Sequence, residues 1–108
     1  MSEILRRVQT LALANDIRIS EHGYDELRKD DIALDEVLAG IATAVLVEEY
    51  RNRDRGLSVL TLQTDRKGQP IHVVWGLPAG ERRPAVLITV YRPDPEIWDN
   101  NFRARRIR

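Results

Sequence analysis

The 108-residue sequence predicts an α+β fold in which N-terminal helices pack on an antiparallel sheet of about four strands. Two observations support this prediction. Apolar residues recur at helical spacings up to Thr43, whereas short apolar runs bounded by glycine, proline and charged turns follow it. The links between these later runs are too short for crossover connections, and short links favour antiparallel pairing.

Three helices are predicted in the first half of the chain. Apolar residues spaced three and four apart predict amphipathic helices over residues 2–14 and 34–41. Residues 22–29 are expected to form a short helix with Ser20 as its N-terminal cap. Before that cap, residues 16–20 alternate polar and apolar side chains, a pattern that is compatible with a short strand.

Four strands are predicted in the second half, over residues 44–50, 57–64, 70–75 and 85–91. The length of the chain predicts a single domain over residues 1–108. Within it we expect a leading helix up to residue 14, a core over residues 18–98 and a basic tail over residues 99–108. Arginines at 103, 105, 106 and 108 make this tail basic.

The composition excludes several classes of function. The chain has no cysteine, which excludes disulfides, thiolate catalysis and cysteine-ligated zinc or iron–sulfur sites. It lacks a phosphate-binding glycine loop, so no nucleotide cofactor is expected. Its apolar runs are shorter than the roughly 18 residues that a membrane span needs, and its N-terminus does not resemble a signal peptide. We therefore expect a cytoplasmic protein without a membrane contact.

The formal net charge is zero, but the charges are unevenly distributed along the chain. Residues 1–54 hold 7 basic and 12 acidic side chains, whereas residues 55–108 hold 10 and 5. This asymmetry predicts one acidic and one basic face. Within the second half, we expect Arg66, Lys67, Arg103 and Arg105 to bind RNA phosphates, provided that they converge in space.

His22 is the first candidate for acid–base chemistry. On a helix, His22 shares a face with Glu26 and Asp30, and a carboxylate four residues away orients an imidazole and favours its protonated form. The alternative is a structural histidine that bonds only to the backbone or to Glu26. The same three side chains could also bind a divalent metal, but they form no sharp spacing motif, and no metal is predicted.

Further candidates lie in and just after the predicted strands. His72 stands in an apolar strand, where it is either a catalyst or a hydrogen-bonded core residue. Arg92 ends the last strand, where it is placed to clamp a phosphate or to pair with Asp94 or Glu96. Tyr91 and Trp98 are suited to stack on a base, with the alternative that Trp98 folds back onto the edge of the core.

Four stretches of the chain resemble the small bacterial proteins of the domain-of-unknown-function 4258 family. They lie within residues 18–106 and comprise Ser20–His22 with Glu26–Leu27 and Asp30–Ile32; Val47–Tyr50; Gly68–Val74; and Ile88–Pro95 with Trp98. Many members carry arginines in the first helix, where this chain has Glu26 and Asp30. His22, His72, Tyr91 and Arg92 match the family.

The resemblance implies an α+β domain similar to the ribonuclease toxins of the RelE, BrnT and MqsR kind, paired with a small zinc-finger antitoxin. The leading expectation is therefore a metal-independent endoribonuclease. His22 would act as base or acid, Tyr91 or His72 as its partner, and Arg92 with Arg103 or Arg105 would stabilise the phosphorane. The alternative is a non-enzymatic protein-interaction module or an inactive relative, in which both histidines are structural.

Overall fold

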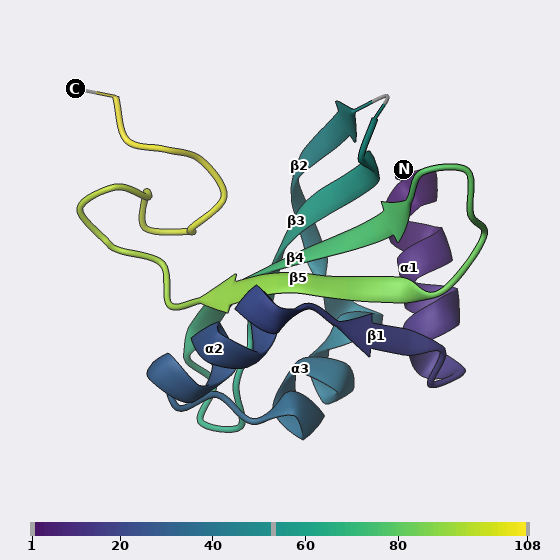
Figure 1. The fold of residues 1–108 in the computed structure, drawn as a ribbon. Coiled ribbons are helices and arrows are strands. Elements are labelled where there is room, and N and C mark those ends of the chain that lie inside the picture. Colours follow the sequence, from purple (N-terminus) through teal and green to yellow (C-terminus); the bar gives the residue numbers. More distant parts are fainter. Residues whose placement is uncertain (1, 53, 108) are drawn as a thin grey trace.

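The computed structural model describes residues 2–52 and 54–107. Three α-helices, a 3₁₀ turn and five strands follow one another in the order α1 (Glu3–Leu13), β1 (Ile17–Ile19), α2 (Glu21–Lys29), α3 (Leu34–Gly40), η1 (Ile41–Thr43), β2 (Val45–Asn52), β3 (Gly56–Thr64), β4 (Pro70–Pro78) and β5 (Ala85–Tyr91) (Figure 1). The predicted α+β class is confirmed. β4 continues three residues beyond the predicted strand, and the third helix gives way to η1 at Ile41.

The sheet differs from the prediction in strand number and direction. It has five strands in the order β1-β5-β4-β3-β2, and β1 runs parallel to β5 while all other neighbours are antiparallel. Ile17 pairs with Ala85, far along the chain. The length of a link predicts the pairing only of strands that are consecutive in sequence, so it gave no information on this pair.

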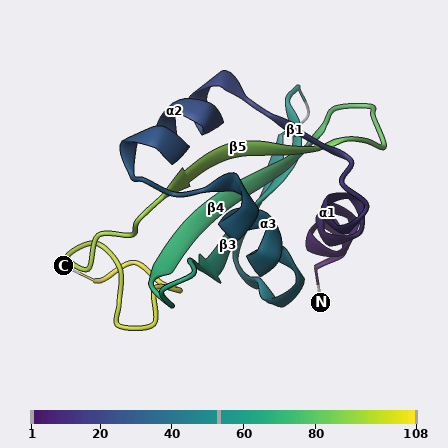
Figure 2. The same ribbon diagram turned by 90° about the horizontal axis from the view of Figure 1, so that it is seen from below.

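The helices cover one face of the sheet and form the core with it. Figure 2 shows α2 along β5 and α3 over the central strands, with α1 to the right of α3. α1 contacts β3, β4 and β5. Val8, Val37, Val73 and Trp75 are among the fully buried residues between these layers. Ser20 caps α2 as predicted, because its hydroxyl oxygen accepts the Gly23 N–H at 2.9 Å.

The opposite face of the sheet, which we call the far face, carries three lateral rows of side chains. Strand register defines them: Arg18, Val86, Gly76, Ser58 and Tyr50 form the first row; Thr89, Val74, Leu60 and Glu48 the second; Tyr91, His72, Leu62 and Val45 the third. After β5 the chain turns back, and residues 97–106 fold over the third row, beside the far end of β5 (Figure 1).

A β-bulge in β2 determines what this face carries. Leu46 pairs with Thr61 and packs toward the helices, whereas Glu48 pairs with Leu60, on the far face. The extra residue, Val47, reverses the alternation, so Glu48 and Tyr50 point away from the core.

Within residues 2–52 and 54–107, the structure has no helix that is both long and apolar enough to cross a membrane.

Candidate functional site

His72 lies at the centre of the third row and is completely buried. Its Nε2 is 2.7 Å from the carbonyl oxygen of Phe102, and its Nδ1 is 3.1 Å from the hydroxyl of Tyr91. Trp98 packs edge-on against the imidazole, with ring centroids 4.4 Å apart. The C-terminal segment, residues 97–106, therefore covers His72. Of the two alternatives for this residue, its environment is that of a hydrogen-bonded core histidine.

These contacts define the protonation of His72. A carbonyl oxygen can only accept, so Nε2 carries the proton and donates to Phe102, which leaves Nδ1 to accept from Tyr91. Burial lowers the pKa of His72 below its ordinary value of 6.5, although the bond to Phe102 partly opposes this shift. A neutral imidazole thus holds the Tyr91 hydroxyl in a defined orientation.

A second set of polar groups lies on the far face next to this histidine. Glu48 accepts a hydrogen bond from the Tyr50 hydroxyl at 2.9 Å and forms an ion pair with Arg105. The Arg105 guanidinium also lies 4.7 Å from the ring centroid of Trp98, which fits a cation–π contact. We call these residues, with His72 and Tyr91, the sheet-face cluster.

Unlike His72, the polar groups of this cluster reach solvent. The side chains of Glu48 and Arg105 are 29% and 57% exposed, and Tyr50 is 38% exposed. Burial, followed by the bond to Glu48, raises the pKa of Tyr50, and burial raises the pKa of Tyr91. The cluster therefore presents a carboxylate, a guanidinium and two protonated phenols near one open surface.

Arg92 lies in a different place, because it points to the other side of β5. Its Nη1 donates to the Asp65 carboxylate at 2.9 Å, and its backbone N–H donates to Asp30 at the end of α2 at 3.2 Å. The sequence left open whether Arg92 clamps a phosphate or pairs with Asp94 or Glu96. In the structure its ion pair is with Asp65, a partner 27 residues away in the chain.

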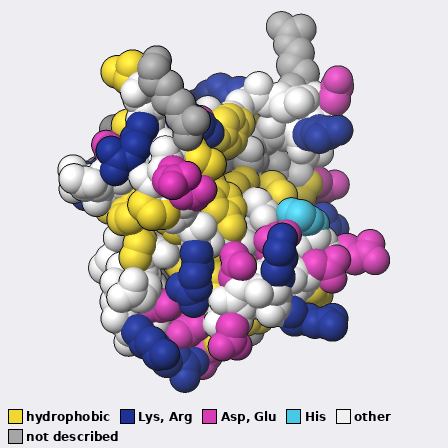
Figure 3. Space-filling view, turned by 90° about the vertical axis from the view of Figure 1, so that its left-hand side faces the viewer, with side chains coloured by type: hydrophobic (Ala, Val, Ile, Leu, Met, Phe, Trp, Pro, Cys, Tyr) yellow, Lys and Arg dark blue, Asp and Glu magenta, His cyan; other side chains and the backbone are white. Residues whose placement is uncertain are grey.

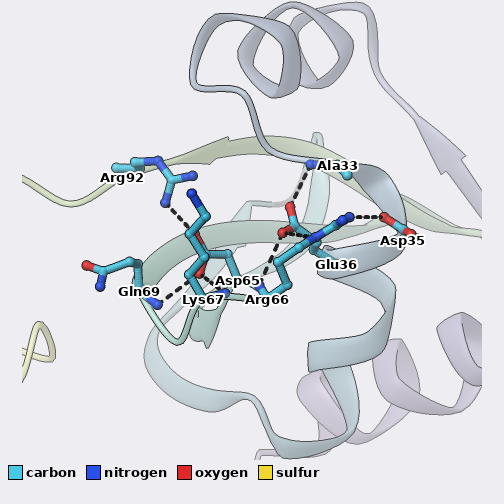
Figure 4. A network of polar contacts seen from close by, with 8 residues as sticks. All are labelled: Ala33, Asp35, Glu36, Asp65, Arg66, Lys67, Gln69 and Arg92. Carbon is cyan, nitrogen blue, oxygen red and sulfur yellow. Dashed lines mark hydrogen bonds and ion pairs between the residues drawn. The ribbon is translucent and has the colours of Figure 1, made fainter.

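Arg66 and Lys67, from the β3–β4 hairpin, join Arg92 around a hollow of about 580 Å³. Figure 4 shows the contacts, which we call the hairpin network: Arg66 binds Glu36 at 2.7 Å and Asp35 at 3.5 Å, beside the Arg92–Asp65 pair. Both arginines in this network already have carboxylate partners.

Asp65 is the most enclosed carboxylate of the hairpin network. Asp65 accepts the backbone N–H groups of Lys67 and Gln69 at 2.9 Å each, in addition to Arg92. The Gln69 bond and Arg92 hold its pKa below the ordinary value. A carboxylate with a lowered pKa and three donors is a poor base, so this network is suited to fastening the hairpin to the helices.

The remaining predicted residues do not join either set. His22 is exposed on α2 and contacts Glu26 at 3.9 Å, as its spacing predicted. Arg103 is exposed on the C-terminal segment, where its backbone N–H donates to Asp99. Since His72 is buried, it shares no open cleft with His22. Among the described residues, no group of three or more histidines and carboxylates is placed to hold a metal ion.

The predicted RNA-binding residues do not converge on one surface, because Arg66 and Lys67 lie by the helices and Arg105 on the far face. On the side of the molecule that Figure 3 shows, basic and acidic side chains are intermingled around apolar surface. The acidic first half and the basic second half of the sequence therefore do not form separate acidic and basic surfaces on this side of the molecule.

Sequence reasoning missed Glu48 and Tyr50 as site residues. Both stand in the stretch Val47–Tyr50, which carries part of the family resemblance. This resemblance was the feature of the sequence that could have indicated them as site residues. Regular alternation would have placed Glu48 on the same side as Leu46, and only the bulge in β2 places it on the far face.

The comparisons with known proteins agree with part of the sequence analysis. A family model described as a domain of unknown function (DUF4258) matches residues 19–92, more than half of the chain. The chain belongs to this family. The match includes Glu48, Tyr50, His72 and Tyr91 but ends before Trp98 and Arg105. No curated protein and no solved structure is significantly similar to the chain.

Proposed function

We propose that this DUF4258 protein is a metal-independent endoribonuclease similar to the RelE and BrnT toxins, acting in the cytoplasm and neutralised by a small antitoxin of the zinc-finger type. The observation that supports this proposal is the Glu48–Arg105 pair, which lies on the far face beside two phenols. A carboxylate, a cation and a protonated acid are the three groups that cleavage of RNA without a metal needs.

Glu48 is the proposed general base. The reaction is attack of a ribose 2′-hydroxyl on the adjacent phosphorus, which forms a 2′,3′-cyclic phosphate and releases the 5′-hydroxyl of the next nucleotide. Glu48 receives the 2′-hydroxyl proton, since a carboxylate has about four acceptor positions and Tyr50 and Arg105 occupy only two of them.

Arg105 is the proposed electrostatic stabiliser. Its guanidinium has five N–H donors, and Glu48 and the Tyr50 hydroxyl are its side-chain partners in this cluster. The other donors are suited to the phosphorane oxygens, where negative charge develops. This retains the role predicted for Arg105, whereas Arg92 is already neutralised by Asp65.

Tyr50 is the proposed general acid. Its hydroxyl proton, which is directed at Glu48 in the free protein, passes to the departing 5′-oxygen, and its raised pKa keeps this proton in place at neutral pH. Tyr91 lies on the same face, two rows away on β5, and is held by the neutral His72. His72 is buried and would act as a positioning residue, because it orients Tyr91 without reaching the substrate.

The test compares two neighbouring glutamates on opposite sides of β2. Glu48→Gln keeps the size of the side chain but removes the base, and should lower the rate of cleavage of single-stranded RNA by about 10²–10⁴-fold. Glu49→Gln is the matched control, because Glu49 contacts Ser2 and Arg51 instead. We expect growth arrest and RNA cleavage with the unmodified chain and with Glu49→Gln, and their loss with Glu48→Gln.

A non-enzymatic protein-interaction module is the second candidate. His72, the histidine of the sheet-face cluster, is buried, and Arg105 already has an acidic partner. Intact RNA at high expression of the unmodified chain would favour this module over the enzyme. Cleavage that survives Glu48→Gln would contradict the assignment of the base.

A further inference from the structure

The first row of the far face forms the floor of an open hollow of about 460 Å³. Gly76 is at its centre, between Val86 of β5 and Ser58 of β3. A Cβ at Gly76 would lie only 2.6 Å from Cδ1 of Ile88, so the glycine makes room for the Ile88 side chain, which forms part of the apolar floor. The C-terminal segment covers the third row and leaves this part of the sheet open.

Two arginines line the hollow, Arg18 and Arg55. Arg18 projects from β1, and Arg55 stands at the β2–β3 turn. Within residues 2–52 and 54–107, no carboxylate forms an ion pair with either guanidinium, in contrast to Arg66, Arg92 and Arg105. Asp54 is the one carboxylate among the described residues that line the hollow, so the positive charges there outnumber the negative ones.

The hollow is continuous with the sheet-face cluster. Tyr50 lines it and also bonds to Glu48, two residues away along β2. Two residues along a strand span about 6.6 Å, so the hollow begins one row away from the proposed base. A chain bound across Glu48 and Arg105 would therefore have its next unit in the hollow.

We propose that this hollow is a nucleotide subsite, which binds the nucleotide of single-stranded RNA next to the scissile phosphate. This inference rests on the proposed function. The base lies on the apolar floor formed by Gly76 and Val86, and Arg18 and Arg55 bind the flanking phosphates. Single-stranded RNA fits because it combines a flat apolar base with a regularly charged backbone, whereas an apolar peptide would leave both arginines unpaired.

The first measurement is binding of a short single-stranded RNA with 2′-O-methyl riboses, which cannot be cleaved, as a function of salt. Each phosphate contact with a single strand contributes about 0.7 to the slope of log K against log salt concentration. The double variant Arg18→Ala/Arg55→Ala should therefore flatten the slope by about 1.4. Arg6→Ala/Arg82→Ala is the matched control with equal loss of charge outside the hollow, and its slope should equal that of the unmodified chain.

A second variant tests the floor without changing the charge. Ser58→Ile places a branched aliphatic side chain in the hollow beside Gly76, which fills space without offering an aromatic ring for a base to stack on. We expect it to weaken RNA binding at least tenfold while the salt slope remains that of the unmodified chain. Thermal unfolding of both variants checks that they remain folded.

The outcomes separate this subsite from the proposed activity. RNA binding with the expected slope change, but without cleavage of ordinary RNA, would support the subsite and contradict the endoribonuclease. Cleavage by the unmodified chain, with equal slopes and affinities in the hollow variants, would overturn the subsite alone. Absence of RNA binding at low salt would overturn both.

Discussion

The hairpin network and the sheet-face cluster contain the same kinds of side chains in opposite states. In the hairpin network, Asp65 is 5% exposed and accepts three hydrogen bonds, and Arg66 and Arg92 each contact a carboxylate. In the sheet-face cluster, Glu48 and Arg105 are partly exposed and have unused hydrogen-bonding positions. The difference lies in the carboxylates: Asp65 is enclosed by its three donors, whereas Glu48 is partly exposed and retains open acceptor positions. Similar side chains therefore do not imply a similar role.

Among the variants that compare the two regions, replacement of the two arginines should give the largest difference in cleavage rate. Arg105→Ala should lower the cleavage rate of single-stranded RNA by about 10²–10³-fold, since it removes the cation proposed for the phosphorane. Arg92→Ala should leave the rate per folded molecule within about twofold and lower the urea midpoint of unfolding. The rates come from RNA cleavage at saturating substrate, and the midpoints from far-UV circular dichroism.

The opposite result would reverse the comparison. If Arg92→Ala abolished cleavage with an unchanged urea midpoint while Arg105→Ala cleaved normally, the hairpin network would be the active site. The original expectation for Arg92 from the sequence would then stand.

Local sequence patterns predicted the local elements well. The spacing of apolar residues predicted α1 and α3. Ser20 was recognised as the cap of α2, because its contact with Gly23 joins residues only three positions apart. The parallel pairing of Ile17 with Ala85 was not predicted, since no local pattern encodes contacts between residues so far apart.

The same limit applies to the candidate site. The contact of His22 with Glu26 is local and was predicted, whereas the contacts of Arg92 with Asp65 and of Arg105 with Glu48 are formed only by the fold. Glu48 was missed for a further reason, because a bulge changes the face of a strand without a clear change in sequence pattern.

Asp65→Asn is expected to have a smaller effect, and on stability alone. The asparagine amide has one oxygen and one NH₂ group. If the NH₂ group faces Arg92, two donors meet; if it faces the backbone N–H groups of Lys67 and Gln69, these lose their acceptor. The urea midpoint should fall further than in Glu49→Gln, with cleavage per folded molecule unchanged. An unchanged midpoint would show that the hairpin network does not fasten the β3–β4 hairpin to the helices.

The smallest effect concerns the pH dependence of stability, which should differ between the two regions. Burial lowers the pKa of His72, so the unfolded chain binds more protons than the folded one once the pH falls below about 6.5. Stability should therefore decrease from pH 6.5 downward, by at most about 1.4 kcal/mol per pH unit. The lowered pKa of Asp65 acts only below its ordinary value of 3.8.

His72→Gln isolates this contribution. Glutamine retains an N–H donor and an oxygen acceptor for Phe102 and Tyr91 but does not titrate in this range. Urea unfolding between pH 7 and pH 5 should give a sloped free energy of unfolding for the unmodified chain and a flatter one for the variant. Among the charged groups near the imidazole, Arg105 disfavours its protonation and Glu48 favours it. Equal slopes in the two proteins would mean that the C-terminal segment does not keep His72 buried in solution, and that the sheet-face cluster includes an accessible imidazole.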